Sequence, residues 1–128
     1  MKKVKLIGLA LTLVLIMGCK MQATAGWAQV TAVLTADQKT VSSDYALFDA
    51  VEMFCCTQST SAYPIKFQAY GKNSSSGTVA LEKEISYNVG TSGSVIITAI
   101  HNYHKIQLTG WNVNSAVKNC IGYGYITD

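Results

Sequence analysis

Two histidines three residues apart, His101 and His104, are the side chains of this chain best suited to metal binding or proton transfer. Protein zinc sites need three or four ligands, and the chain has no other histidine. Asp49, Glu52 or a cysteine would therefore have to complete such a site. Histidines on a surface turn are the simpler interpretation, so the sequence predicts neither a metal site nor a cofactor.

A hydrolase would need a nucleophile, a base and an orienting acid that meet in space. A serine or cysteine, either histidine, and Asp44, Asp49 or Glu52 supply these residue types, as almost any chain would. The motifs G-x-S-x-G, H-E-x-x-H and Cys-x-x-Cys are absent, as is a phosphate-binding loop. The sequence therefore favours a non-enzymatic protein, and a small secreted hydrolase or metal-dependent enzyme is the weaker alternative.

Three cysteines follow the first 25 residues: Cys55, Cys56 and Cys120. In an exported chain we expect a disulfide, and neighbouring residues of a strand face opposite ways, so Cys120 can easily pair with one of the two only. We predict a Cys55–Cys120 bridge, worth about 4 kcal/mol in the chain-entropy model. Cys56 would then be a free buried thiol or a link to another chain, and a strained Cys55–Cys56 bridge is the remaining arrangement.

Residues 1–25 have the features of a bacterial export signal. Lysines at positions 2, 3 and 5 precede an apolar run over residues 6–17, which is too short to span a bilayer comfortably. We therefore expect the protein to be exported, and residues 26–128 to form a single β domain.

Two cleavage sites compete within this leader. Residues 16–19, Ile-Met-Gly-Cys, resemble a bacterial lipobox, which implies cleavage after Gly18 and a diacylated Cys19 that anchors the protein to a membrane. Residues 23–25, Ala-Thr-Ala, instead match an ordinary signal-peptidase site, which would release a chain that begins at Gly26 and discard Cys19. The protein is thus expected to be either a surface lipoprotein or a secreted protein.

The charge of the chain argues against nucleic acid as a partner. All ten basic residues are lysines and the formal net charge is +3. Loss of residues 1–25 removes four lysines and no acid, so six lysines remain against seven acids, a net charge of −1. Nucleic-acid binding depends on arginine and on clustered positive charge, and neither is present. A membrane would be contacted only through a lipid on Cys19.

The long stretch from Thr78 to Trp111 predicts three strands. Residues 78–89 alternate between apolar and polar, interrupted only by Lys83. Glycines at 90 and 93 supply a tight reversal, residues 94–100 form an apolar run typical of a strand covered on both faces, and residues 104–111 alternate again. We expect these strands to form an antiparallel meander.

Further strands are predicted over residues 26–36, 65–70 and 119–127. The segment 41–56 is ambiguous: Ser43 is a natural N-cap and an apolar stripe follows, so a short helix near residues 43–55 is one interpretation. The predicted fold is mainly β, a small antiparallel β-sandwich or barrel of about six or seven strands.

The last strand places Gly122 and Gly124 on one face and Tyr123 and Tyr125 on the other. Close approach of two packed sheets explains such glycines most simply, whereas a ligand platform formed by the tyrosines is the sharper interpretation. With Trp111, they are the candidate ligand-binding residues. The expected function is an exported surface or extracellular binding module for a protein or carbohydrate. The alternative is a structural subunit that forms homo-oligomers through β edges or a spare cysteine.

Overall fold

The computed structural model describes residues 29–98 and 100–128, and all of their regular structure is β. The predicted export signal, both of its cleavage sites, Cys19 and residues 26–28 lie outside the described residues. Because the described part of the chain contains no helix, it offers none that could cross a membrane. The strands form two antiparallel sheets, which confirms the mainly-β sandwich expected from the sequence.

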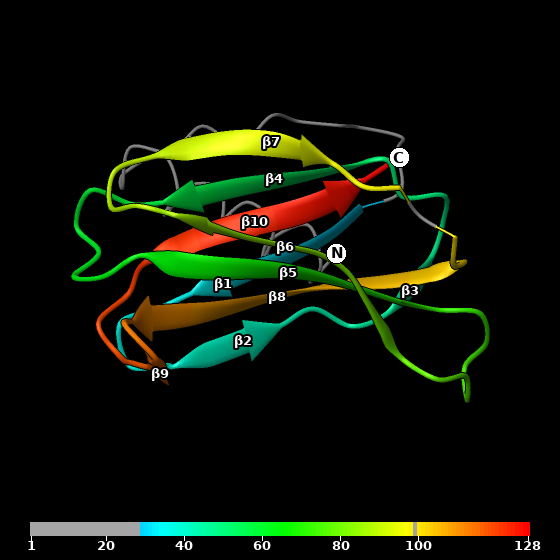
Figure 1. The fold of residues 1–128 in the computed structure, drawn as a ribbon, viewed down its shortest axis with the longest axis horizontal. Coiled ribbons are helices and arrows are strands. Elements are labelled where there is room, and N and C mark those ends of the chain that lie inside the picture. The colour runs from blue at the N-terminus through cyan, green and yellow to red at the C-terminus, as the bar shows by residue number, and fades with distance from the viewer. Residues whose placement is uncertain (1–28, 99) are drawn as a thin grey trace, which may run out of the picture.

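The first sheet has four strands in the order β1 (Gln29–Leu34), β10 (Gly122–Thr127), β4 (Glu52–Thr57) and β7 (Ser92–Ile96). In Figure 1 the strands run along the longest axis, with β7 at the top.

The second sheet has six strands. Its main path is β2 (Thr40–Ser42), β8 (Tyr103–Asn112), β5 (Ile65–Lys72) and β6 (Ala80–Tyr87), and the short strands β3 (Ala46–Leu47) and β9 (Ser115–Ala116) also pair with β8. Three of the strands described in the two sheets have only two or three residues, and the other seven correspond to the number expected from the sequence.

The core fills the space between the sheets and depends on glycines in β10. A side chain at Gly122 would meet Ile65 and the carbonyl oxygen of Cys56, and one at Gly124 would come within 2.9 Å of Ile106. The two glycines therefore let β10 lie close beneath the second sheet, as the simpler interpretation of this stripe expected.

The helix considered near residues 43–55 does not form. The segment instead contains the whole short strand β3 and the start of β4, which pairs with β10 and β7 on its two sides. Met53 and Cys55 of β4 enter the core, while Phe54 and Cys56 belong to a separate apolar cluster on the other face of the sheet. Both faces of β4 are thus apolar, so its sequence lacks the alternation of a half-exposed strand.

The predicted meander over residues 78–111 is also wrong. β6 and β8 lie in the second sheet on either side of β5, whereas β7 belongs to the first sheet. The turn between β6 and β7, with Gly90 at φ 77°, therefore crosses from one sheet to the other. β7 is an edge strand, and its Ile96 is 64% exposed, so it is not covered on both faces as its composition indicated.

Candidate functional site

The outer face of the six-stranded sheet, turned away from the core, carries a network of hydrogen-bonded polar side chains. Alternate residues of β8 and β5 point to it, because successive side chains of a strand face opposite ways. The residues that enter the core from these strands include Ile106, Leu108 and Phe67. Their neighbours in sequence lie on the outer face and are mostly half-buried by one another.

A row of hydrogen-bonded side chains crosses the middle of this face. Ser42 Oγ donates to Gln107 Oε1 at 3.0 Å, Gln107 Nε2 donates to Gln68 Oε1 at 3.2 Å, and Gln68 Nε2 donates to Glu84 Oε1 at 2.6 Å. These four residues, the amide row, come from β2, β8, β5 and β6 in turn. The row holds both amide groups in fixed orientations and still leaves donor and acceptor capacity for a ligand.

One end of the outer face carries an aromatic ring covered by a lysine. Lys66 Nζ lies 3.3 Å from the centroid of the Trp111 ring, within the range of a cation–π contact. Lys66 pairs with Thr109 on β8, one step from Trp111 on the same face of that strand. This is where the structure places the predicted ligand-binding residue Trp111.

The other end carries the Tyr45 cluster, made of Tyr45, Tyr70, Lys72 and Lys105. Lys72 Nζ lies 4.0 Å and Lys105 Nζ 5.2 Å from the centroid of the Tyr45 ring, and Lys105 Nζ lies 5.5 Å from that of Tyr70. Burial, and then the neighbouring Tyr70, raises the pKa of Tyr45. The Tyr45 hydroxyl is buried and has no hydrogen-bond partner among the described residues.

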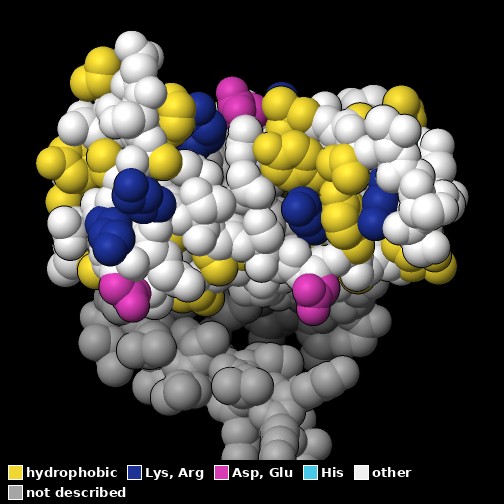
Figure 2. Space-filling view, turned by 90° about the horizontal axis from the view of Figure 1, so that it is seen from below, with side chains coloured by type: hydrophobic (Ala, Val, Ile, Leu, Met, Phe, Trp, Pro, Cys, Tyr) yellow, Lys and Arg dark blue, Asp and Glu magenta, His cyan; other side chains and the backbone are white. Residues whose placement is uncertain are grey.

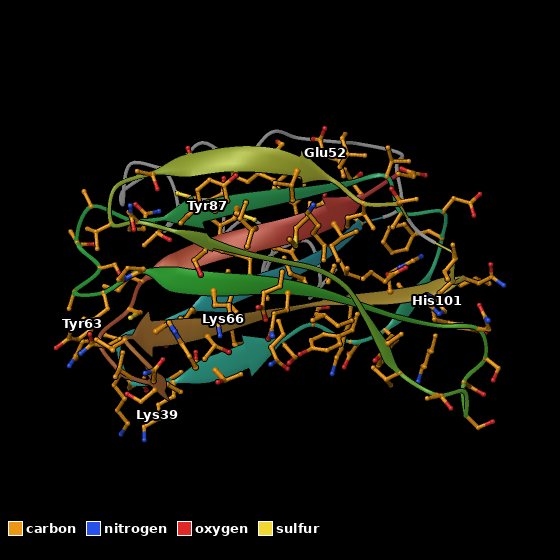
Figure 3. The ribbon with its side chains drawn as sticks, in the orientation of Figure 1. Lys39, Glu52, Tyr63, Lys66, Tyr87 and His101 are labelled. Carbon is orange, nitrogen blue, oxygen red and sulfur yellow. The ribbon has the colours of Figure 1, made fainter. Side chains whose placement is uncertain are left out.

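Figure 2 views the molecule from the side of β2. From this edge, hydrophobic side chains and lysines are visible in both halves of the view, and acidic side chains are visible at its upper and lower borders. Figure 3 shows Lys66 towards one end of the sandwich and His101 at the opposite end. The contacts of the amide row, of Lys66 with Trp111 and of Lys72 with Tyr45 give the outer face a polar centre with an aromatic and cationic site at each end.

A second polar cluster, buried inside the sandwich, begins with an irregularity in β6. Lys83 pairs with Ala69 and Leu81 pairs with Tyr70, which leaves Glu82 without an opposite residue. This is a β-bulge, which redirects the side chain of the extra residue. Here it turns the Glu82 carboxylate inwards, where its side chain is only 2% exposed.

The Glu82 cluster consists of Glu82, His101 and His104. Glu82 Oε1 lies 2.7 Å from His104 Nδ1, and Oε2 lies 3.2 Å from His101 Nδ1. The carboxylate crosses β5 above Gly71, which is opposite His104, and a Cβ at Gly71 would come within 2.6 Å of its carboxyl carbon. Phe48 packs edge-on against the His104 ring at 5.3 Å. The cluster therefore ties β6, β8 and the segment before β8 together.

The chemistry open to the Glu82 cluster is limited by its burial. An ionised carboxylate only accepts hydrogen bonds, so the arrangement assigns a proton to both Nδ1 atoms. His104 Nε2 is buried without a partner among the described residues, and His104 itself is fully buried. No group of three metal-ligand side chains in residues 29–98 and 100–128 is arranged to hold a metal ion. The cluster is suited to holding the fold together.

Sequence reasoning paired the histidines with Asp44, Asp49 or Glu52 and missed Glu82. A signal for it was present, because Lys83 is the one residue that breaks the apolar alternation of residues 78–89. Before the bulge, even-numbered residues such as Ala80 face inwards, and after it Ile85 and Tyr87 do. A break in period within a strand is what a bulge produces.

Tyr123 and Tyr125 lie on the outer face of the other, four-stranded sheet, so the structure does not bring them together with Trp111. They are 0% and 4% exposed and cluster with Phe54, whose ring lies 5.6 and 5.2 Å from theirs, and with Cys56. Burial raises the pKa of both tyrosines. In the structure these two rings pack against Phe54 and the other members of this cluster.

The predicted disulfide between Cys55 and Cys120 is not formed, since both are free, buried thiols. Cys55 pairs with Gly124 across β4 and β10, and Cys120 lies four residues before that glycine. Cys120 precedes the first residue of β10, Gly122, and packs against Gly110 of β8. Burial also raises the pKa of Cys55 well above its usual range.

No protein-family model matches this chain, and no curated protein is significantly similar to it.

Proposed function

We propose that this chain is an exported, non-enzymatic binding module that holds a glycan on the outer face of its six-stranded sheet. The observation that carries the proposal is the amide row, flanked on one side by Trp111 and on the other by the Tyr45 cluster. Sugars present hydroxyl groups, which act as donors and acceptors, together with apolar ring faces. Amides and aromatic rings match both features.

The arrangement of this face favours a glycan over a protein partner. Protein interfaces usually have an apolar centre surrounded by a polar rim. Here the order is reversed, because the amide row occupies the centre and the aromatic rings lie at the ends. Ile96 and Val113, two of the exposed large apolar residues, belong to β7 and to the turn after β8. Leu81 of β6, which is opposite Tyr70, lies at one end of the face and outside the amide row.

The same face argues for binding without cleavage. Glycoside hydrolysis generally uses two carboxyl groups on either side of the scissile bond. The amide row contains one carboxylate, Glu84, and it already accepts a hydrogen bond from Gln68. Glu82, its neighbour on β6, points into the sandwich. The leader of the sequence supports export, which would place the module where it can meet extracellular glycans.

Covalent self-assembly through a spare cysteine gains no support. Cys55 and Cys120 are free thiols that are fully buried. Cys56, expected as a spare thiol, is instead disulfide-bonded and only 3% exposed. None of the three cysteines in the described residues is therefore a spare thiol available to another chain.

The proposal can be tested by affinity electrophoresis of the protein without its leader, through gels that contain soluble polysaccharides. The panel is polygalacturonate, alginate, hydroxyethyl cellulose and dextran. We expect at least one of them to retard the protein, and Trp111→Ala or Tyr70→Ala to weaken that binding at least tenfold, or by about 1.4 kcal/mol, as loss of a binding anchor usually does. Ile96→Ala, which truncates an exposed side chain on the other sheet, is the matched control and should bind normally.

Failure of every polysaccharide to retard the wild-type protein would contradict the proposal. So would binding that survives both aromatic substitutions. Circular dichroism of each variant separates loss of binding from loss of fold.

A further inference from the structure

We propose that the glycan bound by the outer face is an acidic chain that presents carboxylates to the lysines at both ends. The inference rests on the proposed function and names the class of its ligand. It follows from the distribution of charge, from the contacts of the lysines and from the distance between the two ends.

Positive charge is concentrated on this face although the described chain as a whole is slightly acidic. Residues 29–128 contain six lysines and seven acids, a net charge of −1. Three of the six lysines, Lys66, Lys72 and Lys105, lie over rings of the outer face. The acid of the amide row, Glu84, is at the β6 edge and is hydrogen-bonded to Gln68. The face therefore complements a negative ligand.

The lysines occupy the positions in which a sugar would stack. Lys66 Nζ stands 3.3 Å above the Trp111 ring, and Lys72 Nζ stands 4.0 Å from the Tyr45 centroid. A neutral sugar that took the place of either ammonium would break the cation–π contact and would form no ion pair with the displaced positive charge. A carboxylate on the sugar would instead form an ion pair with the displaced ammonium, while the sugar ring packs on the freed aromatic face. The arrangement thus favours acidic over neutral sugars.

The two ends are far enough apart to require a chain. Trp111 and Lys105 lie six residues apart on β8, which corresponds to about 20 Å at 3.3 Å per residue. The amide row crosses β8 between them at Gln107. A single sugar would reach one end only, whereas a linear acidic polysaccharide laid along β8 and β5 would contact both ends and the row between them.

The test compares polygalacturonate and alginate with the same two polymers after methyl esterification, which keeps the backbone and removes the charge. We expect the processed protein to bind at least one acidic polymer at least tenfold more tightly than its ester, with an affinity that falls as salt rises from 50 to 500 mM. Lys72→Gln combined with Lys105→Gln should reduce binding of the acidic polymer about tenfold and thereby narrow the difference in affinity between this polymer and its ester. Lys118→Gln, an exposed lysine outside this face, is the matched control.

The outcomes separate this inference from the proposed function. Equal binding of an acidic polymer and its ester, both lost in Trp111→Ala, would overturn the acidic class and keep the glycan-binding function. Binding of acidic polymers that persists in Trp111→Ala, or equal binding to anionic lipid vesicles, would show charge attraction without a site and overturn the inference. Binding of no polymer at all would contradict both.

Discussion

At the scale of single residues, Cys55 and Cys120 are buried thiols, although the sequence led us to expect a disulfide between them. Cys55 lies in the core between the sheets, and Cys120 is packed beneath Gly110, where a Cβ would come within 2.7 Å of its sulfur. Cys120 Sγ also lies 3.8 Å from the carbonyl oxygen of Pro64. The two thiols fill separate parts of the core and behave there as small apolar groups.

We therefore predict that Cys55 and Cys120 do not react with a thiol reagent in the native protein at pH 8. Reactivity requires the thiolate, and burial both excludes the reagent and, for Cys55, raises the pKa. Mass spectrometry after native and denatured alkylation measures this directly. Both sites should be modified only after denaturation. A peptide that links Cys55 to Cys120 without reductant would contradict the structure.

At the scale of elements, the bulge in β6 determines how one end of the sandwich is closed. It directs Glu82 across Gly71 to His104, and the same carboxylate reaches His101 in the segment that leads from β7 to β8. Both carboxylate oxygens are thereby used within a nearly dry environment. Removing one acceptor should leave a buried imidazole N–H unsatisfied, which is costly.

Glu82→Gln should lower the free energy of unfolding by about 1–3 kcal/mol, the cost of an unsatisfied buried polar group. Glu84→Gln, the same substitution two residues along the strand on the exposed side, is the control and should change stability by less than about 0.5 kcal/mol. Urea denaturation followed by circular dichroism gives both values. Equal effects of the two substitutions would show that the Glu82 cluster does not contribute to stability.

The elements also show which parts of the structure can be predicted from the sequence. The alternation of apolar and polar residues over β5 and β8 predicted strands, because it is a local period of the sequence. The glycines of β10 predicted a close contact between the sheets, because a residue without a side chain leaves room for neighbouring atoms. The pairing of β6 and β7 with different sheets could not be predicted, because a short turn is equally compatible with a hairpin and with a crossing between sheets.

The candidate site was predicted less well than the fold. Trp111 was identified from its residue type, but its partner Lys66 and the amide row come from strands that are distant in sequence. Period-two alternation places residues on a face without giving the neighbour across the sheet. The residues of the outer face therefore became visible only with the register between β5 and β8.

At the scale of the whole molecule, tyrosines make the fold sensitive to alkali. Burial is the largest cause that raises the pKa of five of them above the usual value of 10.0: Tyr45, Tyr70, Tyr87, Tyr123 and Tyr125. In the unfolded chain these groups ionise near pH 10, whereas the folded chain keeps them neutral to higher pH. Their contribution to stability is thus complete below pH 10 and is lost as the pH rises past it.

We expect these tyrosines to leave the urea midpoint of unfolding unchanged between pH 8 and pH 9.5. Above pH 10 the midpoint should fall steadily. Absorbance at 295 nm should show several tyrosines that ionise only above pH 10 in the folded protein and near pH 10 in urea. Ionisation of all tyrosines near pH 10 in the folded state would contradict their burial.

The central claim is that the outer face of the six-stranded sheet binds the ligand. An NMR titration of the ¹⁵N-labelled protein without its leader with short oligogalacturonides tests this claim most directly. We predict that shift changes concentrate on Lys66, Gln68, Lys105, Gln107 and Trp111, which belong to β5 and β8 on this face. Changes centred on Tyr123 and Tyr125 of the opposite sheet, or none at saturating ligand, would contradict the claim.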